Sequence, residues 1–252
     1  MSVVVVFAVE DEFAPWRRLR RFHRTEVGGA CCYRASVGDA SVFVTFTGVG
    51  ARRIEHVSAL AGLYKATAGI AAGLAGGLKP QWRPEDVLAA EEICHESRTD
   101  CLPADPTLLR VATRCGAKPV QRFVTLERIA RTAEEKSRLA RLADAAEMES
   151  LPVMKQFSRD GVPAVAIRAI ADTSEMDMPF DFEATLDAKG QVRILRLLGQ
   201  LARSPQKAPG LVRFGLTSRR AAVSLTSFLD RFIEQLVGQQ SIAAKRPVAV
   251  AG

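Results

Sequence analysis

Short runs of β-branched and aliphatic residues alternate along the chain with segments whose apolar residues recur at helical spacing. Runs of the first kind, bounded by polar residues and glycines, are typical of buried strands. The predicted strands are Val3–Val9, Val42–Thr47, Thr67–Ala72, Val87–Glu91, Val120–Thr125 and Ala164–Ile170. Because strands that alternate with helices favour an α/β architecture, we expect an α/β sandwich around a largely parallel sheet.

Helical spacing and capping residues mark the segments between these strands. Apolar residues at helical spacing predict helices over Ala51–Tyr64 and Glu149–Asp160. The pair Asp105-Pro106 is typical of a helix N-terminus, and Thr132-Ala-Glu-Glu135 resembles a capping box that opens another helix.

The pattern becomes purely helical from about Gly190 and contains two apolar stripes. The stripes consist of Val192, Ile194, Leu195, Leu197, Leu198 and Leu201, and of Val223, Leu225, Phe228, Leu229, Phe232 and Leu236. Ser204–Gly210 between them has the composition of a turn. We therefore expect a main domain over 1–189, a basic helical extension over 190–242 packed on the same domain, and a frayed tail over 243–252.

Composition excludes several protein classes. Hydrophobic residues make up 48% and charged residues 25% of the 252 residues, as in ordinary globular proteins and unlike disordered or collagen-like chains. No apolar run approaches the ~20 residues of a membrane-spanning helix, and the first run ends at Glu10, too early for a secretion signal. The five cysteines form no C-x-x-C pair, so we expect reduced thiols and a cytoplasmic protein.

The positive charge is concentrated near the C-terminus. The net charge is +7, yet the segment from Lys189 to Arg231 alone holds nine basic residues and one acid, Asp230. The rest of the chain is close to neutral. Such a segment fits contact with nucleic acid, with an anionic membrane surface or only with water.

Two glycine-rich turns are predicted directly after strands, at Gly48–Gly50 and Gly73–Gly77. At strand ends of an α/β sheet such turns let a ligand approach the backbone, although tight turns without a ligand have the same composition. The chain has neither G-x-G-x-x-G at its first strand nor a P-loop, so dinucleotide and nucleoside-triphosphate sites have little support.

Three acidic residues stand at the ends of predicted elements. Glu12 follows the first strand, Glu149 begins a helix and Asp172 ends an apolar strand. Acids at the carboxyl edge of a sheet can form a site, but by position alone a helix cap or a solvated surface acid is the more common explanation for each of them.

Taken in order, these motifs resemble the nucleoside phosphorylase superfamily. The resemblance covers roughly residues 1–180 and is carried by the following segments: Val3–Glu12, Thr47–Gly50, Gly73–Leu78 with Asp86-Val87, Glu147–Glu149 and Val162–Asp172. The branch that it resembles most is the methylthioadenosine/S-adenosylhomocysteine nucleosidases. The resemblance implies a three-layer α/β/α sandwich with a mixed, mostly parallel sheet, no metal or organic cofactor, and an oligomer, for which we expect a homodimer.

The resemblance also implies roles for individual residues. Glu12 matches the acid that orients or deprotonates the attacking water, and Asp172 matches the acid that protonates the departing purine. Glu149 matches the acid that accepts the ribose hydroxyls, with Met148 beside the sugar and Gly76 in the glycine-rich turn against the substrate. These residue types suit N-glycosidic cleavage, because a carboxylate stabilises a cationic sugar and a protonated acid stabilises the leaving base.

Departures from the family pattern bear on the reaction. Phosphorylases usually carry an arginine shortly before the glycine-rich turn to hold phosphate, and Ala68–Ala72 has none, which favours hydrolysis. Arg52 and Arg53, just after Gly50, remain an alternative source of that charge. The segment that cradles adenine in typical nucleosidases is replaced by Thr125–Lys136.

Four features resemble the hopanoid-associated phosphorylases, a group implicated in removing adenine from adenosylhopane. They are Gly73–Leu78 followed by Arg83–Asp86, Glu135-Lys136 before Ala146–Ser150, Asp187–Gly190, and the two basic helices. The resemblance implies an adenine nucleoside substrate with an apolar 5′ group. The basic C-terminal helices then fit peripheral contact with anionic lipid at the inner membrane face, although a solvated surface explains them equally well. Phe180, in the Met- and Phe-containing segment Thr173–Phe182, is a candidate lid over the 5′ group, with ordinary loop packing as the alternative.

Other functional classes have weaker support. Cys94-His95 with Cys101 lacks the spacing and the fourth ligand of a zinc site, and Cys31-Cys32 has no nearby histidine to activate a thiol. The basic segment has few aromatic residues and no recognition motif, so we expect no nucleic-acid partner. A phosphate-dependent purine phosphorylase and a non-catalytic adenosine-binding or lipid-surface adaptor remain the alternatives to a nucleosidase.

Overall fold

The structure is a computed structural model that describes residues 1–178, 206 and 208–244. Its strands are β1 (Ser2–Phe7), β2 (His23–Val27), β3 (Ala30–Val37), β4 (Ala40–Phe46), β5 (Ala68–Gly77), β6 (Val87–His95), β7 (Cys101–Pro103), β8 (Lys118–Thr125), β9 (Ala145–Glu147) and β10 (Ala164–Asp172). Its helices are α1 (Glu10–Leu19), α2 (Glu55–Leu63), α3 (Pro106–Arg114), α4 (Ala133–Leu139), α5 (Ser150–Arg159) and α7 (Ala208–Ala244).

The predicted α/β class is confirmed. The six predicted strands correspond to β1, β4, β5, β6, β8 and β10, and the four helices predicted before residue 190 correspond to α2, α3, α4 and α5. Asp105 caps α3 by accepting hydrogen bonds from the backbone N–H of Thr107 and Leu108, both at 2.9 Å. Thr132 caps α4 by accepting from the N–H of Glu135 at 3.1 Å.

The strands form a single mixed sheet in the order β10-β6-β8-β9-β5-β1-β4-β3-β2, with β7 added beside β6. The central pairings of β1 with β4 and β5, and of β10 with β5, are parallel. Among the described strands the antiparallel share is larger than predicted, because β2, β3 and β4 form consecutive hairpin pairings and β10 also pairs antiparallel with β6. The polar strand β2 and the helix α1, which contains Pro15, gave too weak a pattern to be predicted.

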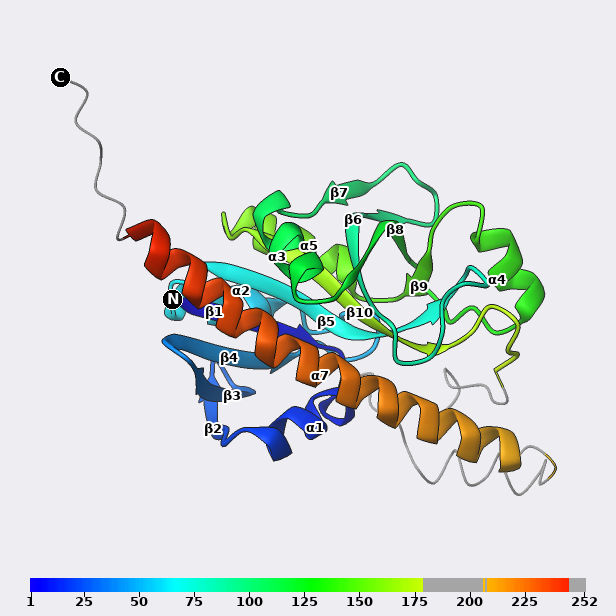
Figure 1. The fold of residues 1–252 in the computed structure, drawn as a ribbon, viewed down its shortest axis with the longest axis horizontal. Helices are drawn as coiled ribbons and strands as arrows, with labels where there is room; N and C mark the ends of the chain where they lie inside the picture. Colours follow the sequence, from blue (N-terminus) through cyan, green and yellow to red (C-terminus); the bar gives the residue numbers. More distant parts are fainter. Residues whose placement is uncertain (179–205, 207, 245–252) are drawn as a thin grey trace.

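Helices cover both faces of this sheet, in three layers (Figure 1). The valine-rich strand β1 is buried on both faces, which is why its sequence is a continuous apolar run and not an alternating one. Val3, Val5 and Phe7 pack in the core on the side of α1, α3 and α7. Val4 and Val6 pack in a second core on the side of α2 and α5.

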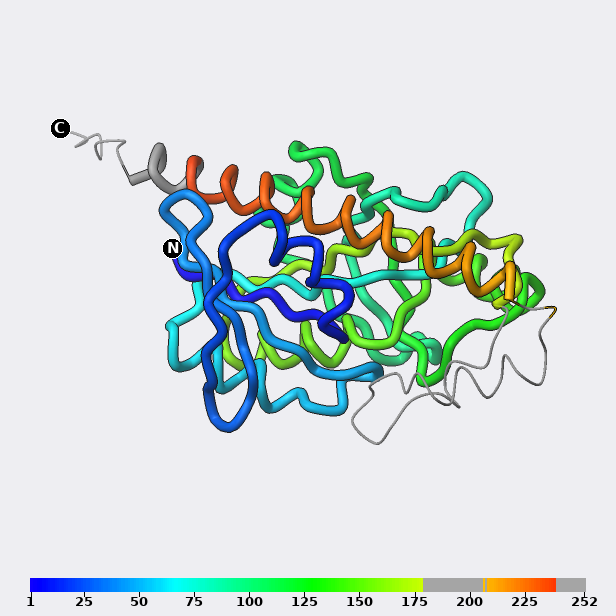
Figure 2. Tube along the Cα trace, turned by 90° about the horizontal axis from the view of Figure 1, so that it is seen from below, coloured from blue at the N-terminus to red at the C-terminus, as the bar shows by residue number. Residues whose placement is uncertain are grey.

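The helix α7 runs along one side of the molecule over most of the sheet, past the N-terminal segment (Figure 2). Its apolar stripe is buried as predicted at Leu225, Phe228, Leu229, Phe232 and Leu236. Val223, in contrast, is 47% exposed, because the buried face passes through Ala221 and Ala222 instead. The predicted turn at Ser204–Gly210 is wrong at its end, since α7 already begins at Ala208, and the first stripe (192–201) lies outside the described residues.

Part of the sheet closes on itself at the end of β5. This strand pairs with β10 on one side and with β9 on the other, while β6 and β8 connect β10 back to β9. The glycine-rich segment Gly73–Gly77 is therefore the last part of a strand, and the predicted turn there is wrong. Gly76 faces Asp172 on one side and Ala146 on the other, which brings the ends of three strands together.

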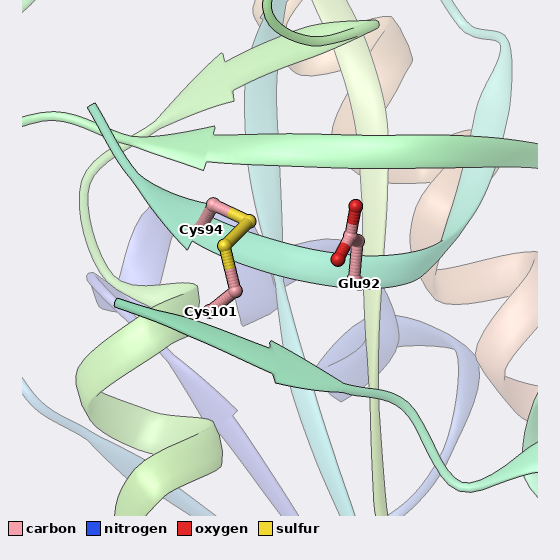
Figure 3. Close-up of side chains that lie close together, drawn as sticks. All are labelled: Glu92, Cys94 and Cys101. Atoms are coloured by element: carbon pink, nitrogen blue, oxygen red, sulfur yellow. A yellow bond between two sulfur atoms is a disulfide. The ribbon is translucent and has the colours of Figure 1, made fainter. Parts of the chain in front are cut away.

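The two cysteines nearest β7 correct the expectation that all cysteines are reduced. Cys94 on β6 and Cys101 on β7 face each other in the antiparallel register and form a disulfide, whereas Cys31, Cys32 and Cys115 are free (Figure 3). Glu92 lies near the two sulfur atoms, and its carboxylate accepts a hydrogen bond from Nε of Arg122 at 2.8 Å. Because both sulfurs are bonded to each other, neither is a thiolate ligand for a metal.

Within the part of the chain that is described, none of the helices has both the length and the hydropathy of a membrane span.

Candidate active site

A cavity of about 640 Å³ opens at the carboxyl ends of the strands, between the sheet and the helices α1 and α7. Such a position is the usual ligand site of an α/β sheet. Five of the six residues predicted to form a site line this cavity, namely Glu12, Gly76, Met148, Glu149 and Asp172. The sixth, Phe180, lies outside the described residues. The structure thus brings together acids that are up to 160 positions apart in the sequence.

Glu12 is held by backbone donors in the first turn of α1. Its Oε1 accepts a hydrogen bond from the N–H of Leu74 at 2.9 Å, and its Oε2 accepts from the N–H of Ala8 at 3.2 Å. The side chain therefore bridges the ends of β1 and β5. Burial raises the pKa of Glu12, and the nearby guanidinium of Arg168 opposes that increase.

Arg168 occupies the centre of a buried group of charges. It lies on β10, is 1% exposed, and its Nη2 donates to Oε2 of Glu147 and, at 2.9 Å, to Oγ of Ser150. Its Nη1 contacts Oε2 of Glu149 at 3.5 Å. One guanidinium thus fixes the positions of two carboxylates, which is a task for which its planar set of donors is suited.

Glu149 lies just before the first residue of α5 and points into the cavity. Its Oε1 accepts a hydrogen bond from the N–H of Gly50, at 3.0 Å, in the predicted turn after β4. Gly50 has φ +74°, a conformation that favours glycine. Burial raises the pKa of Glu149 to about 7, with Arg168 opposing the increase and Glu147 adding to it. A carboxyl group near the midpoint of its titration at neutral pH is typical of functional sites.

Asp172, at the end of β10, forms a buried ion pair with Lys136 of α4. Asp172 is 4% exposed and Lys136 is 1% exposed. The Lys136 Nζ also donates to the carbonyl oxygens of Thr173 at 2.9 Å and Met176 at 2.7 Å. Burial raises the pKa of Asp172, and the charge of Lys136 acts in the opposite direction.

Two glycines of β5 make room for these charged groups. A Cβ atom at Gly73 would lie 2.1 Å from Nη1 of Arg168 and 3.2 Å from Oε1 of Glu12. A Cβ at Gly76 would lie 3.3 Å from Oδ2 of Asp172. The glycine-rich segment is thus explained by the close approach of side chains to a strand, and not by turn geometry.

Sequence reasoning did not assign a role to Arg168, Glu147 or Lys136. The first two belong to quoted motifs, and their signal is a charged residue within an otherwise apolar buried strand end. Lys136 gives no such signal, because on sequence alone it belongs to a charged capping segment of α4. Its burial depends on where the tertiary fold places α4.

The cations around the cavity differ from those considered in the sequence. Arg52 and Arg53 are not among the residues that line it. Arg18 of α1, Arg128 and Arg219 of α7 lie along it instead, all three exposed, and Arg128 is paired with Glu135. Among the described residues, the cation whose charge acts on both Glu12 and Glu149 is Arg168, which already binds Glu147.

The side of the cavity formed by α1 and α7 combines apolar residues with charged and polar ones. The residues of these helices that line it are Asp11, Glu12, Ala14, Pro15, Arg18, Phe214, Gly215, Ser218, Arg219 and Ala222. Met178, in the segment Thr173–Phe182 that is a candidate lid, lies along the same cavity. The volume extends well past the acids, so the site has room for a second, apolar part of a ligand.

Comparisons with known proteins agree with this fold. The family model of the phosphorylase superfamily matches residues 2–202. A mutant of the Helicobacter pylori nucleosidase MTAN with 5′-methylthioadenosine in the active site has 14% identity and a TM-score of 0.71, with 93% of this chain and 98% of that chain covered. The 5′-methylthioadenosine/S-adenosyl homocysteine nucleosidase of Campylobacter jejuni has 15% identity and a TM-score of 0.71, with 93% and 99% covered.

Futalosine hydrolase of Helicobacter pylori is similar to the same degree, with 15% identity, a TM-score of 0.71, and 93% of this chain and 98% of that chain covered. At such identities the likeness concerns the fold. No curated protein sequence matches the chain. Because the family model spans most of the sequence, this chain belongs to the phosphorylase superfamily.

Proposed function

We propose that the protein is a purine nucleosidase that hydrolyses the N-glycosidic bond of a 5′-substituted adenosine and releases adenine. The observation that carries this proposal is the meeting of three buried carboxyl groups, Glu12, Glu149 and Asp172, in one cavity beside Arg168. Solved structures of similar fold include nucleosidases, one with 5′-methylthioadenosine bound.

The three acids suit the charges that develop as an N-glycosidic bond breaks. The ribose becomes an oxocarbenium-like cation, and the bonding electron pair moves to the base. In this proposal the carboxylate of Glu149 accepts hydrogen bonds from the ribose hydroxyls, and Asp172 delivers a proton to a ring nitrogen of the base. Glu12 takes a proton from the water that attacks the anomeric carbon.

Charge near Glu12 favours water over phosphate as the nucleophile. Among the described residues, Arg168 is the cation whose charge acts on Glu12, and it already pairs with Glu147 and contacts Glu149. A phosphate dianion placed beside Glu12 would face buried carboxylates, and the nearby Arg168 is already paired with one of them, which is strongly unfavourable in a site of low dielectric constant. A phosphate-dependent phosphorylase is therefore the second candidate.

The first experiment measures adenine release by chromatography, from methylthioadenosine and from a 5′-alkyl adenosine, with and without phosphate. We expect release without phosphate and no increase when phosphate is added. Release that requires phosphate would show that the enzyme is a phosphorylase and would contradict the proposed hydrolysis.

The Asp172→Asn variant separates an enzyme from a non-catalytic adenosine-binding adaptor. We expect adenine release to fall roughly 10²- to 10⁴-fold, the usual contribution of general acid catalysis, while nucleoside binding measured by calorimetry persists. If wild-type protein binds the nucleoside without turnover, the adaptor alternative replaces the enzyme.

The finer proposal is that the 5′ group is a large hydrocarbon, with adenosylhopane as the substrate. The support is the resemblance of the sequence to the hopanoid-associated group and the apolar cavity wall of Ala14, Pro15, Phe214 and Ala222. We expect kcat/KM to be higher for the 5′-alkyl adenosine than for methylthioadenosine. The reverse order would indicate a methylthioadenosine-type substrate.

The exposed start of α7 suits a lipid surface, and we propose that it makes the peripheral membrane contact. Val212 is 61% and Leu216 54% exposed, and they line a shallow groove together with Arg213 and Arg220. On such a surface the apolar side chains insert among the lipids, and the arginines are attracted to the anionic headgroups.

A vesicle-sedimentation experiment tests this contact. We expect Arg213→Gln with Arg220→Gln to weaken binding to anionic vesicles, and the control pair Arg110→Gln with Arg114→Gln on α3 to leave it unchanged. Equal binding by both double variants would contradict a membrane role.

The homodimer is likewise a proposal, tested by light scattering of the purified protein.

A further inference from the structure

The residue with the most unusual surroundings that the proposed mechanism does not use is Lys136. A lysine ammonium has three N–H donors, and here all three have partners: Asp172 Oδ2 and the carbonyl oxygens of Thr173 and Met176. Its side chain is 1% exposed. A site that offers one carboxylate and two carbonyl oxygens to a buried amine favours the charged ammonium.

The pairing creates a conflict for Asp172. Lys136 as an ammonium favours Asp172 as a carboxylate, since opposite charges in a buried site stabilise each other. A carboxylate, however, has no proton to give to a leaving base. A proton that is needed at the base then has its nearest described source on Lys136, one hydrogen bond away.

We propose that Lys136 is a positioning residue that stores the proton which Asp172 passes to the leaving base. This inference rests on the proposed nucleosidase function. As the bond between the anomeric carbon and the base breaks, its electron pair goes to the base. Lys136 gives a proton to the Asp172 carboxylate and becomes a neutral amine, and Asp172 passes this proton to the base. Water adds to the anomeric carbon and gives a proton to Glu12. Glu12 then loses this proton to solvent, and Lys136 regains one from solvent, so the whole cycle neither consumes nor produces protons.

The loop around Lys136 is built to keep this contact. Besides the two carbonyl contacts, the N–H of Ala133 donates to Oδ1 of Asp177 at 2.8 Å, and the N–H of Met178 donates to the carbonyl oxygen of Arg131 at 2.7 Å. These bonds attach the start of α4 to the segment that follows Asp172. The amine therefore stays against the carboxylate.

Other charged groups surround Lys136 and Asp172, and they are the same in the wild type and in the Lys136 variant. Across the cavity these are Asp11 and Glu12 of α1, Glu147 and Glu149 around the end of β9, Arg168 of β10, and Arg18, Arg128 and Arg219 at its edge. On the α4 side, Glu135 is bound by Arg128 and by the N–H of Arg131. Only the Lys136 charge changes in the variant described next.

The pH dependence of kcat in Lys136→Met distinguishes proton storage from structural support. In the wild type the pair of Lys136 and Asp172 holds one transferable proton, and an amine is in general a stronger base than a carboxylate. Without Lys136, Asp172 must carry the proton itself, and activity ends as pH rises through the pKa of a buried carboxyl group. We expect the basic limb of the kcat profile to move to lower pH by about one pH unit or more.

If Asp172 instead holds its own proton beside the ammonium, the same variant gives the opposite shift. Removing a nearby cation raises the pKa of Asp172, so the basic limb would move to higher pH. A shift upward, or no shift, would overturn the proposal. Lys118→Met, which removes a half-exposed lysine paired with Asp86 outside the cavity, is the matched control and should keep the wild-type profile.

A binding measurement on the wild type tests the resting state without turnover and without a variant that must fold. The probe is 4-amino-5H-pyrrolo[3,2-d]pyrimidine, an adenine analogue with an N–H at the position of purine N7. It donates to a carboxylate directly, so calorimetry in buffers of different ionisation enthalpy should show no proton release. Release of one proton would show that Asp172 is protonated at rest and would overturn the proposal.

Failure of the proposed function gives different results. If the wild type binds the probe but releases no adenine from any nucleoside, the nucleosidase proposal falls, and proton storage for a leaving base falls with it whatever the calorimetry shows. If the wild type neither binds the probe nor releases adenine, both proposals are overturned. If the wild type releases adenine and Lys136→Met leaves the basic limb of the kcat profile unmoved, only the proposed role of Lys136 is overturned.

Discussion

At the scale of single residues, the site depends on buried acids whose hydrogen bonds offset only part of the cost of removing a carboxylate from water. Glu149 has one backbone donor, from Gly50, and a long contact with Arg168, while Glu147 takes the shorter bonds of that arginine. Burial raises the pKa of Glu149, and the charge of Arg168 opposes this increase only in part. This difference separates a structural acid, Glu147, from an acid that is available to a ligand.

The first prediction concerns catalysis by Glu149. Because its pKa is about 7 and the carboxylate is the form that accepts ribose hydroxyls, kcat/KM should fall as pH decreases below about 7. We expect Glu149→Gln to lose this acidic limb and to reduce kcat/KM on the order of 10²-fold. Glu134→Gln, an exposed acid of α4, is the control. An unchanged acidic limb in Glu149→Gln would contradict the assignment.

The same residue affects stability with a defined sign. Its pKa is higher in the folded than in the unfolded chain, so the folded state binds the proton more tightly. This contribution to stability is complete below the unfolded pKa of about 4.5 and is lost as pH rises through about 7. We expect it to amount to roughly 3 kcal/mol at most and to be absent in Glu149→Gln, as measured by urea unfolding across this pH range.

At the scale of elements, helix ends are where local sequence and structure agree best. Asp105 is followed by Pro106 at the first helical position of α3, and the structure has the predicted cap. The α5 N-terminus is different, because Glu149 makes no capping bond and turns toward the cavity. There Oε2 of Glu147 accepts from the N–H of Glu149 at 2.9 Å and of Ser150 at 2.6 Å, so another residue satisfies the helix end.

The prediction at this scale is that the α3 cap contributes to stability and not to activity. Asp105→Ala leaves two backbone N–H groups without their side-chain acceptor and should lower the free energy of unfolding by about 1 kcal/mol. Asp105→Asn retains a capping oxygen and should lose much less. Both variants should release adenine at wild-type rates, since Asp105 does not line the cavity. A large loss of activity in either would show coupling that this fold does not explain.

At the scale of the whole molecule, the C-terminal helix α7 crosses the sheet and packs against the N-terminal helix α1. It packs on β10 and against α1, the helix that carries Glu12. Asp230 of α7 accepts hydrogen bonds from Nε1 of Trp16 at 2.9 Å and from Nε and Nη2 of Arg20 at 2.7 and 2.8 Å. These hydrogen bonds, at the edge of the core, hold α7 against α1, and both helices form walls of the cavity.

We expect Asp230→Asn to reduce the free energy of unfolding by about 1–3 kcal/mol at neutral pH, because charge-assisted bonds to Arg20 are lost. Burial alone would raise the pKa of Asp230, but hydrogen bonds from Arg20 and Trp16 lower it overall. Its contribution is thus present above the unfolded pKa and is lost as pH falls through the folded value, so wild type and variant should converge in acid. Glu234→Gln, at the exposed edge of the same cluster, should change stability by less than about 0.5 kcal/mol. Parallel curves at all pH values would contradict this account.

The sequence alone determined the α/β class, the central strands and several helix ends. It also identified three acids, one glycine and one methionine that line the cavity, and Phe180 stays a prediction. These features depend on local patterns: apolar runs buried on both faces, capping residues, and polar residues at strand ends. The roles assigned to Glu12, Glu149 and Asp172 came from motif resemblance and stay predictions.

The tertiary structure alone decided which charges meet. Gly73–Gly77 reads as a turn locally, but pairing with both β9 and β10 makes it a strand against which Arg168 and Asp172 lie. Lys136 reads as a surface residue of α4, and the disulfide between Cys94 and Cys101 depends on the β6–β7 register. Such contacts join residues distant in the chain, and their energies depend on burial, which no local pattern specifies.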